Sequence, residues 1–234
     1  MQRRHLVWLP LSAGFLLALG PFSPAYALGL ADLTGKEATA GLKSSLEKGA
    51  AQAIRSLGAK DGFLGNPKVQ IPLPPFLQDA AKLLRTLGQG DQIDSLITAM
   101  NRGAEAAVPM AQPLLVKAVQ SMSVQDAKGI LSGGDTSVTQ FFAQKTRADL
   151  AVKFLPSVTK ATAKVGLAQK YNELAGKAAD MGLVKKEDAN IQKYVTEKAL
   201  DGLYFMIGQE EQALRQHPER YGSALLSKVF GALR

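Results

Sequence analysis

An uninterrupted helical pattern from about residue 188 to residue 216 constrains the fold more than any other feature of the chain. It contains no proline, and His217-Pro218 ends it. Its segment Leu203-Tyr204-Phe205-Met206-Ile207 is apolar on every side of the expected helix. A helix that is apolar all round is usually surrounded by other helices. The pattern therefore predicts a multi-helix bundle with a central hydrophobic helix in the C-terminal half of the chain.

Apolar residues recur at helical spacing through most of the remaining sequence, and proline, glycine and capping residues separate the stretches. We expect Asp91 and Asp135 to cap two of the helices, Pro109 and Pro113 to bend or restart one, and Pro156 to begin another. The expected helices span about 34–58, 76–87, 91–119, 123–132, 135–155, a stretch from 156, 166–181, 188–216 and 218–230. The fold class is all-α.

One stretch, Asp61–Pro75, departs from the helical pattern. Asp61-Gly62 and Asn66-Pro67 are turn signals, and three prolines among residues 72–75 exclude a helix interior. We predict an ordered Pro/Gly-rich surface loop pinned by its apolar side chains. Because no low-complexity linker divides the chain, residues 28–234 are predicted to form a single α-helical domain.

Residues 1–27 have the pattern of a cleaved signal peptide. Arg3 and Arg4 give a positive start, an apolar run follows, and Ala25-Tyr26-Ala27 is a small-x-small cleavage pattern. The apolar run is shorter than the roughly 20 residues of a membrane span, and we expect no transmembrane segment. The pattern predicts a soluble protein in the periplasm or outside the cell. The alternative is an uncleaved amphipathic terminus.

The composition excludes several kinds of chemistry. The chain has no cysteine, so a thiol nucleophile, a disulfide and a thiolate metal site are impossible. Without residues 1–27 only one histidine, His217, remains, which argues against a histidine metal site within one chain. We expect no metal and no cofactor. Removing Arg3 and Arg4 leaves 26 basic against 20 acidic residues, a balance of +6 that does not by itself imply nucleic acid.

Two groups of polar residues lie on or beside expected apolar helix faces. In the first, Asn101 and Glu105 share one flank of a helix, and Arg102 lies three residues before Glu105. They either face a groove or form ordinary surface pairs and interhelical hydrogen bonds. In the second group, Lys198 and Asp201 lie near Tyr194 in the expected central helix. They form either a structural ion pair or a pocket with a desolvated lysine.

Three further candidates are single charged residues, Asp126, Asp135 and Lys145. Asp126 is a possible second carboxylate for Glu105. Asp135 follows Gly133-Gly134, where a helix start is the ordinary interpretation and an anion site the alternative. Lys145 opens a basic stretch that extends to Lys186. Within that stretch a basic face of Lys153, Lys160 and Lys164 forms if the helix continues past Pro156.

The chain resembles a bacterial family of exported proteins of unknown function, number 4197 in its series. The resemblance rests on strings spread over residues 28–234, listed here in chain order: Asp61-Gly62-Phe63, Asn66-Pro67, Ile71-Pro72-Leu73-Pro74, Met100-Asn101-Arg102, Ala104-Glu105, Pro109, Asp126-Ala127, Gly133-Gly134-Asp135, Lys145-Thr146, Tyr171-Asn172, Tyr194–Leu203 and Lys228-Val229-Phe230-Gly231. Thr136 stands where the family usually has a second acid, which weakens a metal site in that loop. The resemblance implies an envelope location and a helical domain, and no activity.

Three functions remain open at this point. The first is a non-catalytic binding or interaction protein of the cell envelope, with an apolar small molecule, a lipid or an envelope protein as its partner. The second is a hydrolase that uses Glu105 with Asp126, or Asp201 with Lys198, as acid and base. The third is a structural protein that rests its basic face on anionic envelope surfaces. Nucleic acid is not expected as a partner, because no aromatic ladder accompanies the lysines.

Overall fold

The computed structural model describes residues 35–186 and 188–217, which form eight α-helices and one 3-10 helix and contain no strand. The signal peptide, the first residue of the helix at 34–58 and the helix at 218–230 that we predicted lie outside these residues. The elements are α1 (Gly35–Gly58), α2 (Pro75–Thr86), α3 (Gly90–Ala107), η2 (Val108–Ala111), α4 (Gln112–Gln120), α5 (Val124–Ser132), α6 (Ser137–Thr162), α7 (Gly166–Asp180) and α8 (Ile191–Gln216).

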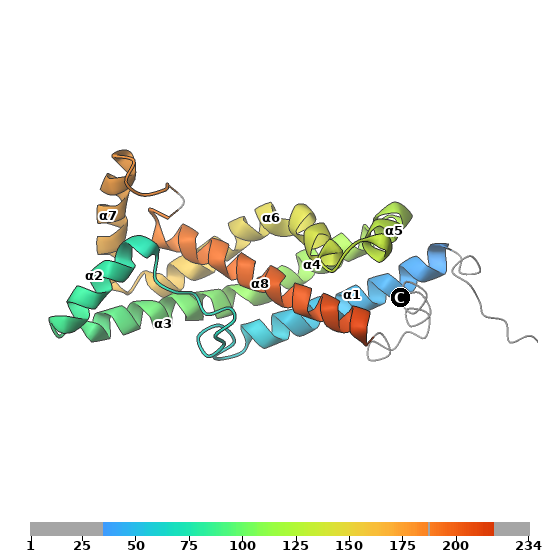
Figure 1. The fold of residues 1–234 in the computed structure, drawn as a ribbon, viewed down its shortest axis with the longest axis horizontal. Helices are drawn as coiled ribbons and strands as arrows, with labels where there is room; N and C mark the ends of the chain where they lie inside the picture. The colour runs from blue at the N-terminus through green and yellow to red at the C-terminus, as the bar shows by residue number, and fades with distance from the viewer. Residues whose placement is uncertain (1–34, 187, 218–234) are drawn as a thin grey trace, which may run out of the picture.

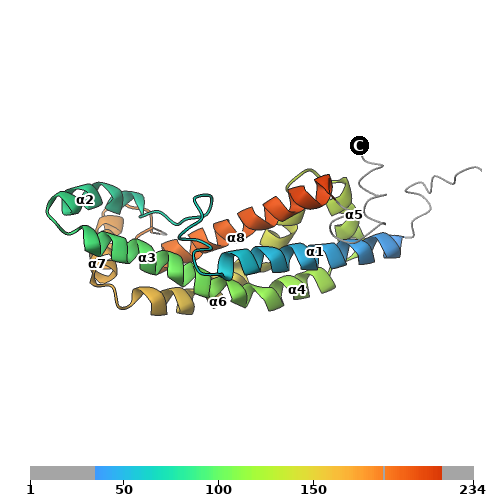
Figure 2. The same ribbon diagram turned by 90° about the horizontal axis from the view of Figure 1, so that it is seen from below.

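The helices form an elongated bundle, and α8 runs along its length (Figure 1). α6 packs against both α3 and α8, and α1 packs against α8 and α4. α2 and α7 lie at one end of the bundle and α5 lies at the other (Figures 1 and 2). The all-α, single-domain bundle predicted from the sequence is confirmed.

The predicted central position of α8 holds for most of its apolar segment. Leu203 is fully buried, Tyr204 is 5% exposed and Ile207 is 2% exposed. Phe205 is the exception, because 41% of it is exposed. The helix is therefore covered on most sides, and Phe205 lies on its remaining open side.

α6 corrects the prediction that a helix ends before Pro156. It continues through this proline to Thr162. Phe154 and Val158 lie on either side of Pro156, four residues apart, and both are fully buried. A proline in a helix interior costs about 3 kcal/mol, whereas burying two such side chains contributes about 1.5–3 kcal/mol each. Continued packing therefore outweighs the proline.

Two predicted helix caps are wrong. Asp91 lies in the first turn of α3, whose N-cap is Gln89. Asp135 precedes Thr136, the N-cap of α6, and Thr136 makes no side-chain capping hydrogen bond. At α5, by contrast, Ser123 and Asp126 form a capping box in both directions. The start of α5 is therefore capped by residues three apart in the sequence, whereas α3 and α6 begin at other residues than the predicted caps.

Candidate functional site

The residues between α1 and α2 cross the bundle as an ordered loop (Figure 1). Polar side chains of α3 hold this loop in place. Asn101 is fully buried. Its Oδ1 accepts the backbone N–H of Ile71 at 2.8 Å, and its Nδ2 donates to the carbonyl oxygens of Ile71 at 3.1 Å and Ile97 at 2.9 Å. The amide thus pairs with the loop backbone as a neighbouring strand would.

Glu105 holds the beginning of the same loop. It is 5% exposed, and its Oε1 accepts the backbone N–H groups of Phe63 and Leu64, each at 3.1 Å. Its Oε2 accepts from Arg102 at 2.6 Å, and Arg102 donates at 2.7 Å to Asp61. The Glu105 carboxylate, followed by the Asp61 carboxylate, raises the pKa of Arg102. Helix α3 therefore holds the loop by a charged clamp as well as by Asn101.

Helix α8 completes the attachment of the loop from the other side. The hydroxyl of Tyr194 donates to the carbonyl oxygen of Pro72 at 3.2 Å. The ring of Phe63 is fully buried and packs over Gly202, where an added Cβ would lie 2.7 Å from Phe63 Cε1. The glycine is therefore required by the close approach of this ring.

We expect Gly202→Ala to lower the free energy of unfolding by about 1–2 kcal/mol. Overpacking costs about 1–3 kcal/mol, and the gain in helix propensity returns part of that. Gly176→Ala in α7 is the matched control, because apart from the backbone of its own helix no described atom lies within 4 Å of its added Cβ. It should raise stability slightly. Urea unfolding followed by circular dichroism measures both, and equal effects of the two substitutions would contradict the packing role.

Tyr194 links α8 to the loop, and Tyr171 links α7 to the turn before α8. Tyr171 donates a hydrogen bond to the carbonyl oxygen of Asp188. Burial, reinforced by the negative charge of Asp188, raises the pKa of each tyrosine from 10 to about 12. The folded state therefore favours the protonated form of both phenols.

The raised tyrosine pKa values predict a loss of stability in alkali. An unfolded tyrosine ionises near pH 10, while these two keep their protons until about 12. Their contribution is complete below pH 10 and is lost as the pH rises to about 12. The fall in the urea midpoint between pH 9 and pH 11 measures this loss of stability, for the wild type and for Tyr194→Phe. The fall should be smaller in Tyr194→Phe, and equal falls would contradict the assignment.

Lys198 and Asp201 form a surface ion pair, which corrects the hypothesis of a desolvated lysine. Their nitrogen and oxygen lie 3.4 Å apart, and the side chains are 43% and 48% exposed. Arg147 of α6 donates to Asp201 at 2.8 Å and to Glu197 at 2.7 Å. The pair borders an open hollow of about 330 Å³ between α8 and loop residues 68–72. Arg147 links α6 to α8 beside the loop.

The remaining candidates lie apart from the loop. Asp126 accepts from the backbone and hydroxyl of Ser123, and these hydrogen bonds lower its pKa. It therefore stays ionised in its own cap. Asp135 and Lys145 are exposed. Glu105 and Asp126 bind separate sets of groups, so the structure does not bring them together as an acid–base pair.

The basic face is partly as predicted. Lys153 and Lys160 are exposed and lie seven residues apart on α6, which continues past Pro156. Lys164 is also exposed but follows the end of that helix. No group of three or more histidine, aspartate or glutamate side chains that suits a metal ion occurs among residues 35–186 and 188–217. Within the described helices, no stretch combines the length and hydropathy of a membrane crossing.

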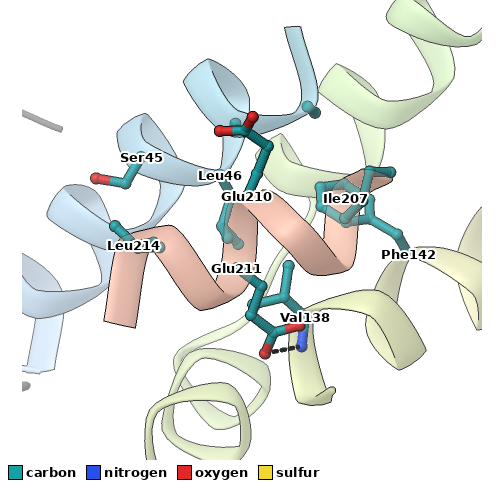
Figure 3. A pocket seen from close by; sticks show the side chains of 10 residues that line it. Ser45, Leu46, Val138, Phe142, Ile207, Glu210, Glu211 and Leu214 are labelled. Carbon is teal, nitrogen blue, oxygen red and sulfur yellow. Dashed lines mark hydrogen bonds between the residues drawn. The ribbon is translucent and has the colours of Figure 1, made fainter. Parts of the chain in front are cut away.

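Glu211 is a buried residue that the sequence analysis did not single out. Its side chain is completely buried. It accepts the backbone N–H groups of Val138 at 3.0 Å and Thr139 at 3.1 Å, the first of which Figure 3 shows. Arg215 donates to it at 3.0 Å. Glu211 therefore caps α6 from α8, in the place where Asp135 was predicted.

A small space of about 10 Å³ lies beside Glu211, between α1, α6 and α8 (Figure 3). Such a volume is about that of one water molecule. Ser45 borders it, and the hydroxyl of Ser45 has no hydrogen-bond partner among the described residues. The space is thus sized for a water and is too small for an organic ligand.

A larger groove, of about 510 Å³, lies between α6 and α8. Ala151, Val152 and Leu155 of α6 form its apolar wall, and Val152 is 74% exposed. Thr196 of α8 borders it and is 3% exposed. Small-molecule sites typically measure about 300–1,000 Å³ and are mostly apolar. The groove has the size and lining of such a site.

The fold is an all-α bundle in which buried polar side chains hold a long loop. An apolar groove lies on its surface between α6 and α8. The model for a family of proteins of unknown function (DUF4197) matches residues 32–231, so the chain belongs to that family. The resemblance found in the sequence is confirmed. Comparisons with curated proteins and with solved structures find no match.

Proposed function

We propose that the protein is exported and acts in the cell envelope as a non-catalytic binding protein, with its ligand in the groove between α6 and α8. The observation that carries this proposal is the apolar wall of the groove, where Ala151, Val152 and Leu155 lie together and Val152 is 74% exposed. Exposed apolar surface bordered by polar groups often marks a ligand groove. The signal-like residues 1–27 support the envelope location.

The positions of the polar candidates favour binding over catalysis. Asn101 and Glu105 direct their side-chain oxygens to backbone N–H groups of the loop. A general acid or base must reach a substrate proton, and these side chains are buried under the loop instead. Asp201 borders an open hollow and already accepts from Arg147 and Lys198. The hydrolase alternative therefore has less support than binding.

Native mass spectrometry of the protein from a periplasmic fraction, followed by solvent extraction, tests the proposal. The wild type should have lost residues 1–27 and should carry an additional small-molecule mass. Val152→Asp places a charge on the apolar wall and should lose that mass. Leu174→Asp is the matched control, because Leu174 is 61% exposed on α7 and does not line the groove.

Two results would contradict the proposal. If the wild type, Val152→Asp and Leu174→Asp all carry no additional mass, the groove is not a ligand site. If the protein stays in the cytoplasmic fraction with residues 1–27 attached, the export is wrong.

A further inference from the structure

The wall of the groove opposite α6 carries charged side chains, whereas the α6 wall is apolar. Lys193 lies one helical turn before Thr196 on α8, and Lys186 borders the groove from the turn before α8. Both lysines are exposed, and neither ammonium is paired with an acid in the part of the chain that the structure describes. The groove therefore has an apolar side and a positively charged side.

The acidic group on this side is already neutralised. Glu197 borders the groove, and Arg147 donates to its carboxylate at 2.7 Å. Among the described residues that line the groove, the charge left to face a ligand is therefore that of Lys186 and Lys193. An anionic group is the partner that this charge selects.

A second, independent observation concerns the hydroxyl of Thr196. Thr196 is 3% exposed, and its Oγ1 has no hydrogen-bond partner among the described residues. A threonine in a helix ordinarily donates to the carbonyl oxygen four residues earlier, and this one does not. Leaving a buried hydroxyl unpaired costs about 1–3 kcal/mol. Because threonine in a helix takes either of two χ1 rotamers, the hydroxyl can turn to a ligand oxygen in the groove.

We infer that the groove takes an alkyl carboxylate, with its chain against Val152 and Leu155 and its head group beside Lys186 and Lys193. This inference rests on the proposed binding function and adds the class of ligand. The volume of about 510 Å³ suits one alkyl chain rather than the two of a phospholipid. In this arrangement Thr196 donates a hydrogen bond to a carboxylate oxygen.

Decanoate and decan-1-ol, which have equal chains and differ in head-group charge, test the inference. Binding is followed by NMR titration of the isotopically labelled protein without residues 1–27. Decanoate should bind about 5- to 20-fold more tightly than decan-1-ol, because exposed charge pairs contribute up to about 1 kcal/mol each. Raising the salt concentration should reduce this ratio through screening.

Three variants locate the effect. In the Lys186→Gln, Lys193→Gln double variant the ratio should fall to about 1, whereas Lys170→Gln, an exposed lysine of α7 outside the groove, should leave it unchanged. Thr196→Val should weaken decanoate binding about 5-fold without lowering the urea midpoint, since replacing an unpaired hydroxyl by a methyl group is close to neutral for folding.

The outcomes separate this inference from the proposed function. Equal binding of decanoate and decan-1-ol to the wild type, or an unchanged ratio in the double variant, overturns the carboxylate assignment and leaves an apolar binding site. If the protein binds decyl phosphate and does not bind decanoate, the carboxylate assignment is also wrong. If neither decanoate nor decan-1-ol binds, both the inference and the groove as a ligand site are wrong.

Discussion

Replacing Glu211 with alanine is expected to lower the free energy of unfolding by about 3–5 kcal/mol, the cost of removing one partner of a buried charge pair. The first backbone N–H groups of a helix have no partner within the helix. In α6, those of Val138 and Thr139 are satisfied by the Glu211 carboxylate. The alanine variant leaves both of them and the guanidinium of Arg215 without this acceptor. Since a domain is stable by only about 5–15 kcal/mol, this is a large loss.

Urea unfolding followed by circular dichroism measures the effect of Glu211→Ala. Glu173→Ala is the matched control, since Glu173 is an exposed carboxylate on α7 and should change stability by less than about 0.5 kcal/mol. Glu211→Gln keeps an oxygen for the backbone N–H groups and should fall between the two. If Glu211→Ala is no more damaging than Glu173→Ala, then Glu211 does not cap α6.

The helices could be predicted from the sequence because their causes are local. The apolar spacing of Leu42, Leu46 and Leu57 identified α1, and all three are buried. The ends of the helices were harder to predict, because groups that are distant in the sequence determine where a helix such as α6 begins and ends. α6 begins without Asp135, since Glu211 of α8 supplies the acceptors for its first amides. It passes Pro156 because the packing on both sides favours a continuous helix.

For the polar residues that hold the loop, the sequence indicated which residues matter but not which groups they contact. A polar side chain beside an apolar stripe needs a partner, and this rule singled out Asn101 and Glu105. Their partners lie 30 and 42 residues away in a loop, and no local spacing indicates such contacts. A signal for Glu211 was present but unused. It lies four residues after Ile207 and three before Leu214, on the stripe that is buried.

The second large effect is expected for Glu105→Ala, which should lower the free energy of unfolding by about 3 kcal/mol. The variant leaves the buried N–H of Phe63 and the N–H of Leu64 without an acceptor, and removes one of the two carboxylates that hold Arg102. The loss falls below that for Glu211, because Arg102 keeps Asp61 and is partly exposed.

Hydrogen exchange distinguishes this local role from general destabilisation. In Glu105→Ala the amide of Phe63 should lose nearly all its protection through local opening of the loop, while amides in α6 should lose only the protection that the lower global stability removes. Arg102→Ala is the matched control on the same helix. It leaves the Glu105 carboxylate in place for the loop amides but removes its paired cation, and should cost about 1–2 kcal/mol, less than Glu105→Ala. Equal losses for both variants would mean that the Arg102 ion pairs, rather than the two backbone hydrogen bonds, hold the loop on α3. The structure predicts the opposite order, since the carboxylate is 6% exposed and the guanidinium is 32% exposed.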